Sequence, residues 1–138
     1  MSRRSLLAAG LLVAGLASTS TPAVAATACH AVADQPYTAG ANVLGGGSFV
    51  CDTAAAGMTV TVCVESAALL APLTWVTENC STRSVSSPTS AVHEDVSACV
   101  QGGFKLVRIA VSGSNAEGHE ADAVSTETLA PGVGSCGP

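Results

Sequence analysis

Positively charged and aromatic side chains are both scarce in this chain. Its 138 residues include five Lys and Arg, one Trp, one Tyr and two Phe. Beyond residue 25, three cations (Arg83, Lys105 and Arg108) stand against ten acidic residues, a net charge of about −7. Nucleic acids and anionic membrane surfaces both require clustered Lys and Arg, so the composition argues against either as a partner. Base stacking and large carbohydrate platforms need aromatic rings and are disfavoured for the same reason.

Recognisable catalytic motifs are also missing. The sequence contains no Cys-x-x-Cys, no H-E-x-x-H and no nucleophile elbow, and the triple glycine at 45–47 is not followed by the Lys of a phosphate-binding loop. His93 and His119 each precede carboxylates, but not at a metal-ligand spacing, and His30 is isolated. We interpret the first two as exposed polar turns before strands. The sequence therefore predicts a protein that is not an enzyme and holds no metal or cofactor.

The N-terminal segment has the three parts of a secretory signal peptide. A basic start with Arg3 and Arg4 precedes an apolar run over 6–17, and small residues follow as far as Ala23-Val24-Ala25. The apolar run is shorter than the roughly 20 residues of a membrane span. We expect cleavage after Ala25 or Ala26, which leaves one secreted domain over 26–138 and no membrane span in the mature chain.

The route of export stays open at this point. Residues 2–7, Ser-Arg-Arg-Ser-Leu-Leu, resemble a twin-arginine signal, but paired basic residues are common in general secretory signals too. A lipoprotein anchored at Cys29 is the third alternative. It is disfavoured because Ala26 replaces the larger aliphatic residue of a lipobox and because lipidation would leave an odd number of cysteines.

Six cysteines follow the signal segment, and their even number in an exported chain predicts three structural disulfides. A domain of about 113 residues buries a limited core, and each bridge can add about 2–4 kcal/mol. Fifteen pairings are possible, and the sequence does not choose among them. The six are Cys29, Cys51, Cys63, Cys80, Cys99 and Cys136.

Residues 57–65 give the clearest structural signal, because Met and Val alternate strictly with Thr, Cys and Glu. Alternation of this kind predicts a strand with one buried face. Residues 104–111 predict a second strand with Val107, Ile109 and Val111 facing inward. Weaker strands are expected at 43–51, 73–79, 96–100 and 121–128. The glycines at 45–47 indicate a bulge, a bend or a close backbone approach. Residues 52–56 are predicted to form a short hairpin link. The strands at 43–51, 57–65 and 73–79 would then pair as an antiparallel meander.

Six or seven short strands with turn signals between them predict an all-β fold, a small antiparallel β-sandwich with three disulfides; an open β-barrel is the alternative. The Gly-rich strand ending in Cys51, the strand over 59–64 and the Gly102-Gly103-Phe104 strand entry are similar to features of small, secreted, cysteine-stapled β proteins of high-GC Gram-positive bacteria. Most such proteins have no assigned activity, so this resemblance implies a fold and a location.

We expect a non-enzymatic extracellular binding module whose partner is a protein or a small ligand. Two further hypotheses remain. Residues 80–90 are rich in Ser and Thr and read as an exposed loop, on which Arg83 could enter a protease pocket as the key residue of an inhibitor. The mature length is also similar to that of the enediyne-carrying apoproteins, which would imply a carrier of apolar ligands, although their cysteine pattern is not matched.

Overall fold

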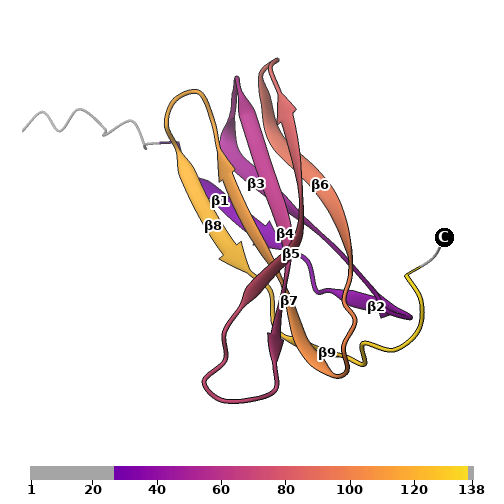
Figure 1. The fold of residues 1–138 in the computed structure, drawn as a ribbon. Helices are drawn as coiled ribbons and strands as arrows, with labels where there is room; N and C mark the ends of the chain where they lie inside the picture. Colours follow the sequence, from indigo (N-terminus) through magenta and orange to yellow (C-terminus); the bar gives the residue numbers. More distant parts are fainter. Residues whose placement is uncertain (1–26, 137–138) are drawn as a thin grey trace, which may run out of the picture.

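The structure, a computed structural model, describes residues 27–136 and consists of two antiparallel β-sheets packed face to face (Figure 1). The described part contains nine strands and no helix, and neither sheet closes on itself. The fold is thus the predicted β-sandwich and not a barrel. The strands are β1 (Cys29–Ala33), β2 (Tyr37–Ala39), β3 (Asn42–Ala55), β4 (Met58–Ala68), β5 (Val76–Val85), β6 (Thr89–Cys99), β7 (Lys105–Ser114), β8 (Glu120–Val124) and β9 (Thr128–Ala130).

We refer to the two layers as sheet A and sheet B. In sheet A, β3 pairs along one edge with β6 and along the other with both β1 and β2. Sheet B has the order β5-β4-β7-β8, and β9 also pairs with β7. The count of nine exceeds the predicted six or seven because β1, β2 and β9 span only three to five residues each, too few to show a period.

The core lies between the sheets, and the two strands with the clearest alternation line its sheet B side. Val60, Val62 and Val64 of β4 are completely buried. On the neighbouring strand β7, Val107, Ile109 and Val111 are also buried. Both predicted inner faces are confirmed, because a strand places every second side chain on the same side.

The glycines of β3 set how closely the two sheets approach. A Cβ atom added at Gly45 would overlap the side chain of Ile109, and one added at Gly47 would overlap Val111. Gly113 of β7 makes the reciprocal approach, since a Cβ there would overlap the buried ring of Phe49. Of the three readings of the triple glycine, close backbone approach is the one that the structure confirms.

The predicted meander is wrong, because β3 and β4 belong to different sheets. β3 runs on to Ala55, through residues predicted to form a hairpin link, and a turn at Gly57 (φ 65°) carries the chain to the facing sheet. β4 pairs with β5 and β7, whereas β3 pairs with β6 over ten register positions. Alternation identifies the apolar face of each strand, but not which of two facing sheets the strand joins.

The predicted loop over 80–90 is also wrong. β5 continues to Val85, and β6 begins at Thr89. Arg83 therefore lies within an edge strand, opposite Val60, and its Nη2 atom is 3.9 Å from Oε1 of Glu94 on β6. Nearly every residue of β5 is exposed, so the strand has no buried face that could show in its sequence.

Three disulfides connect all six cysteines, as predicted. Cys29–Cys51 joins β1 to β3 and Cys63–Cys80 joins β4 to β5, each between directly opposed register partners. Cys99–Cys136 fastens the segment after β9 to the end of β6, as expected for a Gly- and Pro-rich tail that needs an anchor.

The signal segment predicted over 1–25 and the cleavage point after Ala25 or Ala26 lie outside the described residues. In the part of the chain that the structure describes, no helix is long and apolar enough to cross a bilayer. Three disulfides are typical of proteins from oxidising, extracellular compartments.

Candidate functional site

A gap in the edge of sheet A creates a hollow on the surface of the protein. β1 ends opposite Gly47, and β2 begins opposite Leu44, so residues 34–36 bulge away from β3 between them. The amide of Asp34 still donates to the carbonyl of Gly46 across 2.9 Å, which keeps the bulge anchored to the sheet. The backbone at Gly45 and Gly46 is consequently left without a neighbouring strand on this side.

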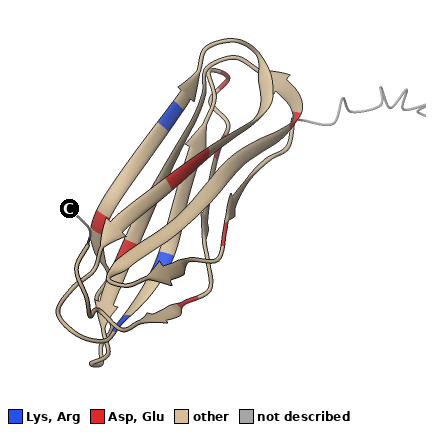
Figure 2. Ribbon diagram, turned by 90° about the vertical axis from the view of Figure 1, so that its right-hand side faces the viewer, with Lys and Arg blue, Asp and Glu red and all other residues tan. Residues whose placement is uncertain are grey.

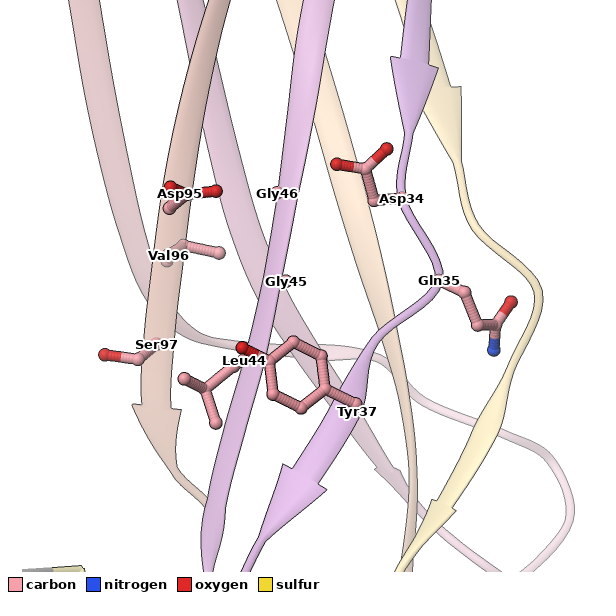
Figure 3. Close-up of a pocket in the computed structure, with 9 residues that line it drawn as sticks. All are labelled: Asp34, Gln35, Tyr37, Leu44, Gly45, Gly46, Asp95, Val96 and Ser97. Carbon is pink, nitrogen blue, oxygen red and sulfur yellow. The ribbon is translucent and has the colours of Figure 1, made fainter.

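The resulting cleft has a volume of about 400 Å³ and opens on the outer face of sheet A (Figure 3). Its floor is the glycine backbone, and its walls come from the β1–β2 link, β2 and β6. The ring of Tyr37 lies beside Leu44, its register partner, and gives the cleft an apolar end. The lining residues are Asp34, Gln35, Tyr37, Leu44, Gly45, Gly46, Asp95, Val96 and Ser97.

The other end of the cleft is acidic. Asp95 is the register partner of Gly46 on β6, and Asp34 lies on the opposite side of the same glycine (Figure 3). The two aspartates are thus two strand positions apart, roughly 10 Å between their Cα atoms. None of the strands of sheet A contains a Lys or Arg, and the three cations of the described part lie on strands of sheet B (Figure 2). No fixed cation neutralises this end.

A chain of hydrogen bonds orients one of these carboxylates. Nε2 of His93 is 2.9 Å from Oδ1 of Asp95, and Nδ1 of His93 is 2.8 Å from Oγ of Ser48. Since an ionised carboxylate only accepts, Nε2 donates to Asp95, and in the neutral imidazole Nδ1 then accepts from the Ser48 hydroxyl. The imidazole lies over Gly46, where a Cβ atom would come 2.8 Å from Oδ1 of Asp95 and 3.0 Å from the ring.

Ser, His and Asp in this order also occur in hydrolases, but here the surroundings differ in two ways. The Asp95 side chain is 84% exposed, so it lacks the buried setting that lets a triad carboxylate stabilise an imidazolium. Ser48 lies in the middle of the sheet, between Val32 and His93, and the neighbouring backbone amides are used in strand pairing. A nucleophilic serine needs free donors aimed at the developing oxyanion.

The histidines singled out in the sequence are not brought together. His30 projects from β1 opposite Val50, His93 belongs to the cleft, and His119 lies beside Asn115 in the β7–β8 turn. The prediction of a polar turn is therefore confirmed for His119 and wrong for His93, which lies within β6. Within residues 27–136, no group of three or more His, Cys, Asp or Glu is arranged to hold a metal ion.

A smaller groove of about 260 Å³ lies on the outer face of sheet B. It runs along β7, where Ser112 and Ser114 are shorter than the flanking Thr59 and Thr61 of β4 and the carboxylates of β8. Two of its hydroxyls are already paired, since Thr59 hydrogen bonds Ser84 and Thr61 hydrogen bonds Thr82. The groove lacks an apolar wall, so the sheet A cleft is the better candidate for a ligand site.

Sequence reasoning missed the cleft because its residues come from three separate segments that meet only through the register of β3 with its neighbours. The available signal was Gly46, an outward-facing glycine inside a strand, a position where glycine is unfavourable unless something approaches closely. Comparisons of the chain with models of protein families, with curated proteins and with solved structures find no match.

Proposed function

We propose that this protein is a secreted, non-enzymatic binding module and that the cleft of sheet A is its ligand site. The observation that carries the proposal is the cleft itself: a concave site of about 400 Å³ on a rigid sheet, with an apolar end and a polar end. Small-molecule sites in proteins have volumes of about 300–1,000 Å³ and combine apolar walls with a few placed polar groups. This combination favours a small ligand over a protein partner.

The scaffold supports a binding role in an extracellular setting. Cys29–Cys51 ties the beginning of β1 to β3, at the opposite end of the strand from the gap, so the bulge at 34–36 follows a strand that is covalently held. Export through the predicted signal segment would place the chain where such bridges form and persist. The alternative of a protease inhibitor built on Arg83 has lost the loop on which it depended, because this residue lies within β5.

The binding proposal is tested by nuclear magnetic resonance on ¹⁵N-labelled, disulfide-intact protein titrated with a panel of cationic, anionic and neutral fragments. We expect at least one class to shift the amide signals of Asp34, Gln35 and Tyr37 and of residues 44–46 and 95–97, while those of Ser112 and Ser114 stay in place. Gly46→Leu pushes its side chain into the His93 imidazole and the Asp95 carboxylate at the border of the cleft and should abolish the shifts. A panel that leaves the cleft signals unmoved at millimolar concentrations, or shifts that persist in a folded Gly46→Leu variant, would contradict the proposal.

The non-enzymatic part of the proposal is tested at Ser48. An activated ester such as p-nitrophenyl acetate reports any nucleophilic serine, and wild-type protein and Ser48→Ala should hydrolyse it at the same rate. His93→Ala serves as the second variant, since it removes the base that a serine nucleophile would need. Hydrolysis that depends on both residues would replace binding with catalysis as the function of this face.

A further inference from the structure

We propose that the cleft of sheet A selects an organic cation attached to a flat apolar group, such as an aryl amidine or an arylalkylamine. This inference rests on the proposed function, because it assigns the chemical class of the ligand to the same site. The juxtaposition that carries it is the pair Asp34 and Asp95 on either side of Gly46, next to the side chains of Tyr37 and Leu44 (Figure 3).

The acidic end accommodates a cation and not a larger group. The imidazole of His93 and Oδ1 of Asp95 lie directly over Gly46, so the open part of the cleft begins beside this carboxylate, and Asp34 lies on the other side of the same glycine. The carboxylate of Asp95 is held by His93, whereas no side-chain partner is described for Asp34. A planar amidinium or an ammonium can donate to both sides at once, and charge-assisted hydrogen bonds of this kind are shorter and stronger than neutral ones.

The apolar end lies at the distance that such a ligand needs. Leu44 and Gly46 are two residues apart on β3, so they face the same side of the sheet and are separated by roughly 7 Å. An aromatic ring bonded directly to an amidinium spans about this distance. Tyr37 is 60% exposed in the structure, so a ligand ring placed against its side chain would remove apolar surface from water.

The charge of the molecule favours the same ligand class. The strands of sheet A contain no Lys or Arg. Of the cations on sheet B, Arg83 is paired with Glu94 of β6 at 3.9 Å and Arg108 with Glu65 of β4 at 2.8 Å, and neither of these glutamates lines the cleft. An anionic ligand would meet two unneutralised carboxylates in this cleft. A neutral ligand could donate a hydrogen bond to a carboxylate but would leave both negative charges uncompensated.

Three isosteric probes test the inference: benzamidine, benzamide and benzoate, titrated separately into the disulfide-intact protein and followed by the amide signals of the cleft. Because both carboxylates are solvent-exposed, each contributes modestly, and we expect benzamidine to bind about three- to tenfold tighter than benzamide. Benzoate should bind more weakly than either. Added NaCl should weaken the binding of benzamidine and leave the binding of benzamide unaffected.

Two charge variants and a matched control complete the test. Asp34→Asn and Asp95→Asn should each reduce the preference for benzamidine, and the double variant should abolish it. Asp122→Asn removes one carboxylate from sheet B and should leave the preference unchanged. Tyr37→Ser should lower the affinities for benzamidine and for benzamide by the same factor. This result would separate the contribution of the apolar contact from that of the charge.

The failure of the inference can be told apart from the failure of the proposed function. Equal affinity of the cleft for all three probes, or a preference that survives the double variant, overturns the ligand class and leaves the cleft as a binding site. If other compounds of the panel bind in the cleft and benzamidine does not, the ligand class is likewise wrong and the cleft remains a binding site. If neither the probes nor the panel perturb the cleft, both proposals fail.

Discussion

Replacing Gly45 by alanine should destabilise the protein, although the same change in an ordinary strand would be favourable. Alanine loses less backbone freedom on folding than glycine does, a gain of about 0.5–1 kcal/mol where the backbone allows it. At Gly45, however, the new methyl group would overlap the buried side chain of Ile109. Overpacking of a core costs about 1–3 kcal/mol, so we expect a net loss of about 1–2 kcal/mol in the free energy of unfolding.

A double-mutant cycle isolates the cause. Ile109→Ala alone should cost about 2–5 kcal/mol, because it removes buried methylene and methyl groups and leaves a cavity. In that background the methyl group of Gly45→Ala has space, so the second substitution should be neutral or stabilising. The two changes should therefore couple by about 1–3 kcal/mol. Gly46→Ala is the matched control: it faces outward and should show no coupling with Ile109→Ala.

The assay is urea unfolding of the oxidised protein, followed by far-ultraviolet circular dichroism and by the fluorescence of Trp75. The slope against urea should be the same for every variant, so that shifts in the midpoint report stability. If Gly45→Ala is as stable as the wild type, or if the cycle shows no coupling, the β3 glycines do not set the distance between the sheets as described. The close approach of β3 to β7 would then be wrong.

Three further predictions test other parts of the molecule. Replacing Cys99 and Cys136 together by serine should cost about 4 kcal/mol in urea unfolding, because this bridge closes a loop of 37 residues; little change would show that the tail does not restrain the unfolded chain. Trypsin should not cleave after Arg83 in the native protein, since a paired strand does not enter a protease cleft. Mass spectrometry should find that cleavage only after the disulfides are reduced, and rapid cleavage of the native protein would support a loop. Arg108→Ala should shift Trp75 emission to longer wavelength, because the guanidinium carbon lies 4.1 Å from the ring centroid, and an unchanged spectrum would contradict that stacking.

A strand that has one buried face and one exposed face is predicted well from its sequence. β4 and β7 are central strands of sheet B, so apolar side chains alternate with polar ones along them, and their inner residues follow from the pattern alone. The three disulfides follow from the number of cysteines in the same way. Each of these inferences depends on a local property of the chain.

The same reasoning fails where a strand has no buried face. β5 is an edge strand with exposed residues on both sides, so its Ser and Thr carry no alternation and read as a loop. That error placed Arg83 on a mobile segment and produced the inhibitor hypothesis. The assignment of β3 to the sheet opposite β4 was missed for a different reason: both sheets offer an apolar inner face, and only long-range register distinguishes them.

The candidate site could not be predicted from local sequence patterns, because every part of it depends on the register between strands. Ser48 and His93 are 45 residues apart and become neighbours only when β3 pairs with β6. Asp34 reaches the cleft only because β1 and β2 share one edge of β3 and leave a gap between them. A pattern search along the sequence sees these as unrelated polar residues, which is why the His93 segment read as a turn.

The triple glycine connects the fold with the proposed function. Gly45 and Gly47 face the core, and the bulk of Ile109 and Val111 accounts for their lack of a side chain. Gly46 faces the opposite way, and the packing of the core places no demand on it. Glycine in a strand interior costs stability, so its presence there requires another reason. The reason that the structure offers is the imidazole and carboxylate lying across it, so a side chain at this position should displace His93 and Asp95 at the border of the cleft and leave the core in place.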